Sequence, residues 1–410
     1  MEKLLSVEEA LEIILARFKE KTSKTVLIDD ALDQILANDI LTKVELPPFD
    51  NSSMDGFAVL ASDVTDSSEE RPVELEVIED IAAGYFPKKI IQSGQASRIM
   101  TGAPLPPGAD AVVPVELTNF SDRYAQQILM ENILVYKPVN PGDYVRPKGQ
   151  DIQKGEKIFS KGHKLRAQDL GFLAAQGIDR VSIIKKPVVA LLSSGDELIK
   201  PGEKLIPGKI YDSNTITIKS LLKSFGAEIL DLGVAKDNFQ DIETKLEKTL
   251  QADIDLIIST AGVSVGVYDF IRDVIHQDGH LNFWKVNIRP GKPLTFGEYK
   301  TKPFLGLPGN PVSAFVSTMI FVKPIINKLL GVKENKLFFE AILLEEISSD
   351  GRESYLRAVI NSENGNNYAK LASHQGSGNI FSLVSANALL IIPAGVKCVP
   401  KGKPVKFFWI

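Results

Sequence analysis

The sequence predicts a multi-domain α/β protein built around a doubly wound, mostly parallel sheet. Its 410 residues exceed one ordinary domain of roughly 100–200 residues. Between residues 187 and 330, short apolar runs alternate with helical patterns. Buried strands that alternate with crossover helices form parallel sheets, so this region predicts the central sheet. Segments rich in short β-type runs flank it on both sides.

The composition excludes several classes of protein. With 44% hydrophobic and 24% charged residues, the chain has the balance of a soluble globular protein. Its net charge of −5 disfavours a broad nucleic-acid surface. The single cysteine, Cys398, excludes an intrachain disulfide and a cysteine zinc cluster. We find no leader peptide and no apolar run of about 18 residues, so we expect a cytoplasmic protein with no membrane partner and no nucleic-acid partner.

Helices are predicted near the N-terminus and again in the middle of the chain. Ser6 and Glu9 have the capping-box spacing and precede apolar residues on one helical face. A second helix is expected over 30–37. The helical pattern returns over 167–176, with Gly177 placed to end that helix.

Residues flanking the central region predict two β-rich domains. Strand-like runs separated by turn clusters indicate a small, mostly β insertion in the N-terminal half. The last part of the chain has strand patterns divided by proline and glycine, as in a small barrel. The expected domains are a discontinuous helical domain over 1–50 and 146–181, an inserted β domain over 51–145, an α/β domain over 182–332 and a C-terminal β barrel over 333–410.

Five loops concentrate glycine, proline and ionisable residues where strands are expected to end. Ligands of parallel sheets bind outside the carboxyl ends of the strands, so such loops are candidate site elements. For the first two, which are rich in turn-forming residues, a simple connecting turn is the alternative. The five loops span residues 47–56, 101–110, 194–197, 260–269 and 285–309.

The third and fourth loops suit a metal and a phosphate. Asp196 and Glu197 follow a predicted strand, where adjacent carboxylates favour a divalent cation or acid–base chemistry; helix capping is the alternative. The small residues Gly262 and Ser264 would let backbone amides approach a phosphate or a pterin. This loop matches neither the P-loop nor the G-x-G-x-x-G pattern, so a plain connector is the alternative.

The fifth loop is cationic. Lys285, Arg289 and Lys292 lie close together around a Pro-Gly turn, and Pro311 then opens a predicted helix. Positive side chains beside a helix N-terminus favour an oxyanion, and a solvated basic face is the alternative.

At these loops the sequence resembles the MoeA-type molybdopterin molybdenumtransferases, the family that includes the E domain of gephyrin. The resembling stretches occur in the family's order, cover nearly the whole chain and are specific as a set. They are PPFDNSSMDGFAV, TGAPLPPGADAVV, GDYVRPKGQDI, SSGDEL, YDSNT, TAGVSVGVYDF, RPGKPLTFG and GLPGNPVS.

The resemblance implies a fold, a reaction and partners. The α/β domain is similar to the molybdopterin-binding domain of molybdopterin adenylyltransferases, and a helical linker domain, a small inserted β domain and a C-terminal β barrel accompany it. Adenylylated molybdopterin and molybdate would give molybdenum cofactor and AMP in the presence of Mg²⁺. The resemblance also implies a homodimer and transient contact with a molybdopterin adenylyltransferase and with acceptor molybdoenzymes.

Matching motifs carry the family's functional positions onto this chain. Where many members have lysine, this chain has Arg289, which keeps the charge but presents a planar fork. Glu197, Asp237 and Asp269 are the implied metal ligands. The implied catalytic positions are Asp55, Thr101, Asp151, Glu197, Asp237 and Asp269. The implied substrate-binding positions are Gly262, Ser264, Lys285, Arg289, Pro308, Pro311 and Ser313.

Two alternatives to molybdenum insertion stay open at this point. A tungsten-inserting homologue would use the same residues, because tungstate and molybdate have nearly the same size and charge. A non-catalytic scaffold, which the resemblance to gephyrin allows, would have no need of the site carboxylates that this chain keeps.

Overall fold

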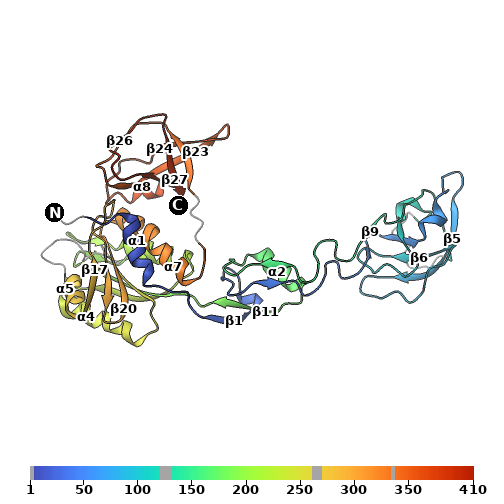
Figure 1. Cartoon of the computed structure of the whole chain (residues 1–410), viewed down its shortest axis with the longest axis horizontal. Coiled ribbons are helices and arrows are strands. Elements are labelled where there is room, and N and C mark those ends of the chain that lie inside the picture. Colours follow the sequence, from blue (N-terminus) through green and yellow to red (C-terminus); the bar gives the residue numbers. More distant parts are fainter. Residues whose placement is uncertain (1–3, 121–130, 261–269, 334–337) are drawn as a thin grey trace. The chain divides into compact units, whose positions relative to one another are not determined.

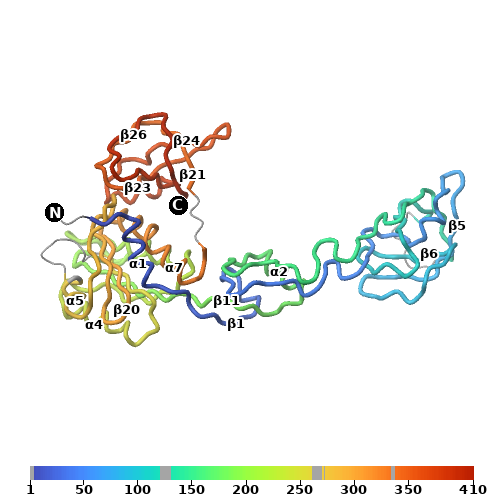
Figure 2. The backbone as a smooth tube through the Cα atoms, in the orientation of Figure 1, coloured from blue at the N-terminus to red at the C-terminus, as the bar shows by residue number. Residues whose placement is uncertain are grey.

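The computed structural model describes residues 4–120, 131–260, 270–333 and 338–410 (Figures 1 and 2). Internal contacts divide the chain into two units. The first unit comprises Met1–Asn38, Lys161–Leu170 and Arg180–Ile410. The second comprises Asp39–Ser160 and Gly171–Asp179. The second unit is therefore an insertion within the first.

A six-stranded sheet forms the centre of the first unit. Its order is β15 (Glu228–Ala235), β12 (Val188–Ser194), β16 (Leu256–Thr260), β20 (Lys302–Leu307), β19 (Thr295–Tyr299) and β17 (Gly279–Phe283). The first four strands are parallel, and the last two add as antiparallel strands at one side. The predicted doubly wound, mostly parallel sheet is confirmed, and the carboxyl ends of its parallel strands share one edge.

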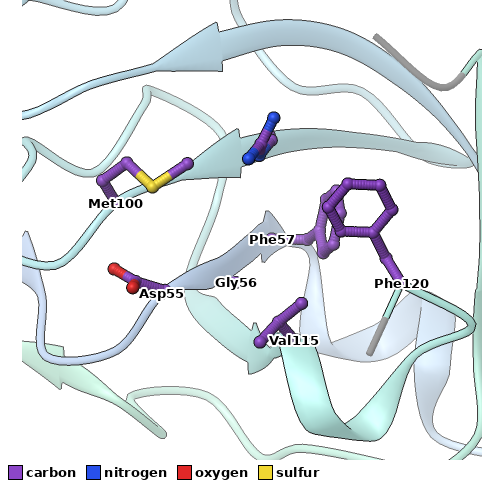
Figure 3. A pocket seen from close by; sticks show the side chains of 7 residues that line it. Asp55, Gly56, Phe57, Met100, Val115 and Phe120 are labelled. Atoms are coloured by element: carbon purple, nitrogen blue, oxygen red, sulfur yellow. The ribbon is translucent and has the colours of Figure 1, made fainter. Parts of the chain in front are cut away.

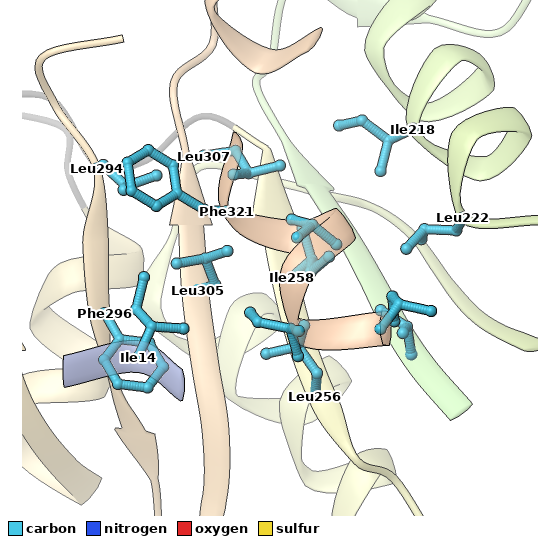
Figure 4. Packing of buried hydrophobic residues seen from close by; sticks show 14 of the residues in the cluster. Ile14, Ile218, Leu222, Leu256, Ile258, Leu294, Phe296, Leu305, Leu307 and Phe321 are labelled. Atoms are coloured by element: carbon cyan, nitrogen blue, oxygen red, sulfur yellow. The ribbon is translucent and has the colours of Figure 1, made fainter. Parts of the chain in front are cut away.

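Alternate side chains of the parallel strands enter two different cores. Leu256 and Ile258 of β16 belong to one core, whereas Ile257 between them belongs to the other. Figure 4 shows Ile14 beside Phe296 in the first core. The first core is covered by α1 (Val7–Ala16), α3 (Ser213–Ser224), α6 (Pro311–Ser317) and α7 (Lys323–Leu329), and the second by α4 (Phe239–Glu247) and α5 (Phe270–Asp278).

One described helical run, Pro311–Leu329, is long and apolar enough to span a bilayer by length and composition. It joins α6 and α7 through a π-helical segment, Thr318–Val322. Of its most apolar window, 67% is buried inside the protein, and Phe321, Ile325 and Ile326 are fully buried. The run is apolar because it is a core helix of the α/β domain.

The C-terminal part closes into a five-stranded barrel. Its strands are β21 (Phe339–Leu343), β24 (Asn366–Leu371), β23 (Glu353–Glu363), β25 (Ala388–Ile392) and β27 (Pro404–Trp409). Closure follows because β23 pairs with both β24 and β25, β27 pairs with both β25 and β21, and β21 pairs with β24. This confirms the predicted barrel. The short elements β22 (Ile347–Ser348), β26 (Cys398–Val399) and α8 (Phe381–Val384) complete it.

The second unit is mostly β, as predicted. Its main sheet has the order β7 (Ala111–Pro114), β4 (Gly56–Val59), β6 (Gln95–Ile99), β5 (Val73–Ile81) and β8 (Asn132–Val135). Two short ladders accompany it. They pair β3 (Asn51–Ser52) with β9 (Val145–Arg146), and β2 (Ile40–Leu41) with β10 (Lys157–Phe159).

The predicted capping box is confirmed at the start of α1, and α2 (Ala167–Ala175) matches the expected mid-chain helix. The helix expected over 30–37 is wrong. Ile35 and Leu36 instead form bridges with Lys164 and Ile183. These pairings satisfy the backbone groups that a helix would have used, next to the ladder of β1 (Ser23–Leu27) on β11 (Arg180–Ile184).

A partly buried ion pair joins the N-terminal segment to the sheet. Lys21 Nζ lies 2.6 Å from Asp255 Oδ2, and their side chains are 12% and 15% exposed. The same carboxylate accepts the backbone N–H of Val188 at the start of β12 at 2.7 Å. Asp255 therefore ties two strand starts and the N-terminal segment together.

We predict that Lys21→Met lowers the free energy of unfolding by about 2–4 kcal/mol, because it leaves the Asp255 carboxylate uncompensated in a poorly solvated position. Urea unfolding of the full chain measures the change. Lys164→Met is the control, since Lys164 and Asp33 form an exposed pair with 55% and 69% exposure and such pairs contribute about 1 kcal/mol or less. Equal effects of the two substitutions would contradict the prediction.

Candidate active site

Carboxylates meet where β12 and β15 end. Asp196 follows β12 and Asp237 follows β15. The backbone N–H of Asp196 donates to Asp237 Oδ2 at 3.0 Å, and the N–H of Asp237 donates to Asp196 Oδ1 at 3.3 Å. These reciprocal bonds bring Asp237 beside the loop that carries Glu197, so two of the predicted acidic positions share one edge of the sheet.

The backbone of Gly195 makes room for the Glu197 carboxylate. Gly195 has a φ of +143°, and a Cβ atom there would lie 2.6 Å from Glu197 Oε2 and 2.9 Å from Oε1. The positive φ favours glycine, and a Cβ atom there would force the Glu197 carboxylate to move. The turn after β12 therefore folds the carboxylate back over its own backbone.

A second set of loops meets at the start of α6. Asn214 Nδ2 in the first turn of α3 donates to Gly309 O at 2.7 Å, directly after Pro308. Pro311 occupies the first turn of α6, and Ser313 is buried two residues later. The barrel also reaches this point, because the backbone N–H of Val312 donates to Ser377 O at 3.1 Å.

The cationic loop packs against the same helix and the barrel. Arg289 lies on β18 (Ile288–Arg289), which pairs in parallel with the start of β23. Gly291 has a φ of +106°, and a Cβ atom there would lie 2.8 Å from Ser317 Oγ of α6. Lys285 Nζ lies 3.4 Å from the centre of the Trp284 ring, a cation–π contact.

A buried arginine lies next to this loop on β23. Arg357 is 1% exposed, and its guanidinium donates to Ser382 Oγ and Gly376 O, each at 3.0 Å. Burial, followed by the positive charge of Arg289, lowers the pKa of Arg357 to about 10, so the group stays charged at neutral pH. Within the described ranges, no ion pair joins Arg357 to a carboxylate. The hydrogen-bond partners of the Arg357 guanidinium among the described residues are therefore all neutral.

The second unit carries the remaining predicted carboxylates. Asp55 Oδ1 accepts the backbone N–H of Thr101 at 2.8 Å and its hydroxyl at 2.7 Å, so these two predicted positions form one pair. Asp151 accepts from Arg146 Nη2 at 2.7 Å, in an ion pair that is about half exposed. Figure 3 shows the Asp55 side chain at one side of a small pocket whose other side holds the Phe57 and Phe120 rings.

The predicted site residues thus fall into separate groups. Asp55 and Thr101 meet in the second unit, which also holds Asp151. In the first unit, the Glu197–Asp237 edge lies on the same sheet as the loops of Pro308, Pro311 and Ser313, and Lys285 and Arg289 lie on the cationic loop. Gly262, Ser264 and Asp269 lie outside the described residues.

Comparison with known proteins decides the family. Family models match residues 5–177 (MoeA N-terminal region, domain I and II), 190–328 (probable molybdopterin binding domain) and 340–408 (MoeA C-terminal region, domain IV). A curated molybdopterin molybdenumtransferase of Nostoc sp. is 37% identical, with 91% of this chain and 85% of the relative covered. The chain belongs to the MoeA-type molybdopterin molybdenumtransferases.

Further relatives agree with this MoeA-type assignment. The molybdopterin molybdenumtransferase of Bacillus subtilis is 33% identical, with 99% of this chain and 94% of the relative covered. A crystal structure of the molybdopterin biosynthesis MoeA protein of Pyrococcus horikoshii superimposes with a TM-score of 0.82 at 33% identity, covering 99% of each chain. A second structure of that protein gives a TM-score of 0.80 at 32% identity, covering 100% of each chain.

In this MoeA-type chain, the motifs selected from the sequence did not include Arg357. One signal was present, because Arg357 is the single charged residue in the apolar run 355–360. A charged residue within a buried strand pattern generally has a specific partner or function. Its partners Gly376 and Ser382 are about twenty residues away in sequence, so the run alone could not reveal them.

We predict that Gly195→Ala lowers the transferase rate of this MoeA-type chain by at least about 10-fold, because the methyl group would displace the Glu197 carboxylate. The rate of AMP release measures the effect. Gly202→Ala is a matched control, since Gly202 also has a positive φ, +95°, but a Cβ atom there meets nothing within 4 Å. If both variants lose activity equally, backbone strain rather than the position of Glu197 is responsible.

Proposed function

We propose that this chain transfers molybdenum from molybdate to adenylylated molybdopterin, releasing AMP and forming molybdenum cofactor. The observation that carries the proposal is Arg357, a buried cation whose guanidinium has only neutral hydrogen-bond partners among the described residues. An uncompensated buried charge is costly, and an oxyanion bound between two arginines would offset that cost with charge-assisted hydrogen bonds. The names of the curated relatives support the same reaction.

The cationic residues suit both anionic substrates. Molybdate is a dianion, and the adenylylated substrate carries a pyrophosphate bond. We assign Arg289, Lys285 and Arg357 to binding these oxyanions. Arg357 and Arg289 offer planar donor forks, which bind oxygen pairs in a fixed orientation. Positive groups held in place before the reaction would also stabilise charge that develops at phosphorus.

The loops around α6 are suited to orienting the substrate rather than to neutralising its charge. Pro308 and Pro311 fix the backbone after β20, and Ser313 lies in the first helical turn. We assign these three residues to substrate binding, together with Gly262 and Ser264 of the loop after β16. Backbone amides at a helix start provide directed donors for an anionic ligand.

The carboxylates that follow β12 and β15, which we call the acidic edge, offer the oxygen donors that a hard divalent cation prefers. Mg²⁺ prefers oxygen ligands and often takes one or two carboxylates, with waters and substrate phosphates completing the shell. The described part of the chain contains no preassembled group of three His, Cys, Asp or Glu side chains for a metal. We assign Glu197 and Asp237 as the residues that would hold Mg²⁺, with Asp269 as the third. The bound cation would neutralise charge on the substrate phosphates.

The second unit contributes a hydrogen-bonded pair and a more exposed carboxylate. We assign catalytic roles to Asp55, held by Thr101, and to Asp151. We also propose that the protein acts in the cytoplasm as a homodimer and makes transient contact with a molybdopterin adenylyltransferase and with acceptor molybdoenzymes. Sedimentation velocity tests the homodimer directly, since a monomer at working concentration would contradict it.

The reaction itself is tested by incubating the full chain with adenylylated molybdopterin, molybdate and Mg²⁺ and measuring AMP. We predict AMP release that depends on molybdate and on enzyme. No AMP above the enzyme-free control would contradict the proposed function.

We predict that Glu197→Gln lowers the rate of AMP release by more than about 10²-fold, as loss of a preorganised charged group in a catalytic site does. Its thermal midpoint should change little, because Glu197 is exposed. Glu203→Gln, in the same exposed segment, is the control and should keep the wild-type rate. An unfolded Glu197→Gln protein would mean that the residue is structural.

A further inference from the structure

A chain of hydroxyl groups connects the ends of two strands to the start of a helix. Ser193 Oγ of β12 lies 2.5 Å from Thr215 Oγ1 of α3 and 2.8 Å from Thr260 Oγ1 of β16. Thr215 Oγ1 donates to Asp212 Oδ2 at 2.6 Å. Asp212, which also caps α3 by accepting the backbone N–H of Thr215 at 3.0 Å, ends the chain.

Three of the four side chains are buried, and Thr215 is partly buried. Ser193 and Thr260 are each 1% exposed and Asp212 is 5% exposed. Buried hydroxyl groups that lose one partner are left with an unsatisfied donor or acceptor, at a cost of about 1–3 kcal/mol. The connected hydroxyl groups therefore have little freedom to exchange hydrogen-bond partners once these bonds have formed.

The carboxylate at one end sets the direction of every hydrogen bond. A carboxylate only accepts, so the Thr215 proton is committed to Asp212. Thr215 must then accept from Ser193, and Ser193 must accept from Thr260. The hydroxyl protons all point toward Asp212.

The place of this chain in the fold connects it to the site. Ser193 and Thr260 are paired neighbours at the carboxyl ends of β12 and β16. The turn with Glu197 begins two residues after Ser193. Asn214, next to Thr215, donates to the backbone of the loop before α6. The hydroxyl chain thus joins three of the elements from which the site loops start.

We propose that Asp212, Thr215, Ser193 and Thr260 form a positioning relay that sets the spacing of these strand ends for the transfer reaction. None of the four residues needs to touch the substrate. The relay acts through the loops that it fixes, above all the turn of Glu197. This inference rests on the proposed function, because its effect is read as AMP release.

The decisive variant is Thr215→Val, which replaces the hydroxyl by a methyl group of similar shape. We expect kcat for AMP release to fall by about 10- to 100-fold, the size of effect that a displacement of about 1 Å produces. KM for adenylylated molybdopterin should change by less than about 3-fold, because binding groups are retained. Thr215→Ser keeps the hydroxyl and should restore kcat to within about 3-fold of wild type.

Thr249→Val is the matched control. Thr249 is a fully buried threonine of the α/β domain, whereas Thr215 is partly buried. Its hydroxyl donates one hydrogen bond, to Leu246 O at 2.6 Å, and it lies away from the carboxyl edge. Thr249→Val should lower the thermal midpoint about as much as Thr215→Val does, and it should leave kcat unchanged. A loss of kcat in both variants would overturn the relay in favour of a general loss of stability.

Ser193→Ala provides a second route if Thr215→Val does not fold. It breaks the middle of the relay, so kcat should fall as for Thr215→Val, and the double variant should lose little more than either single one. An unchanged kcat in a folded variant, or failure of both variants to fold, would overturn the proposal. An inactive wild-type protein would instead contradict the proposed function.

Discussion

Burial of the parallel ladder β15–β12–β16–β20 on both faces is the constraint on which the rest of this structure depends. Since alternate side chains of each strand enter a different core, a shift of one residue would move every apolar side chain into the opposite core and disrupt the packing of both. The strand ends are therefore fixed, and every loop that follows a parallel strand starts from the same edge. The carboxylates after β12 and β15 and the helix start after β20 share one edge of the sheet for this reason.

Much of this arrangement could be predicted from sequence because the signals are local. The capping residues Ser6 and Glu9 and the apolar strand 256–260 each carry their own pattern. The helix expected over 30–37 failed because its competitors, Lys164 and Ile183, are more than a hundred residues away in the chain. The same distance effect applies to the site. Motifs identified Glu197 and Arg289, whereas the hydrogen-bonded environment of Arg357 exists only after the barrel has folded.

The small net charge of the chain hides a separation of charge within its first unit. Acidic side chains collect after β12 and β15, whereas Arg289 lies on β18 and the buried Arg357 on β23. Because Coulomb interactions are stronger where water is excluded, the buried Arg357 contributes more to a local field than a surface arginine would. A metal that is delivered as an oxyanion suits such a site, since recognition of the oxyanion requires cations and hydrogen-bond donors rather than thiolate or imidazole ligands.

Closure of the C-terminal barrel has a consequence for the order of events during synthesis. Strand β27 pairs with both β21 and β25, so the barrel cannot close until residues 404–409 have left the ribosome. The α/β sheet, by contrast, contains all its strands by residue 307 and can fold as a unit much earlier. Arg357 is therefore exposed to water while the sheet matures. The nascent protein would acquire its acidic edge first and its buried cation last, so the site is completed only when translation of the barrel ends.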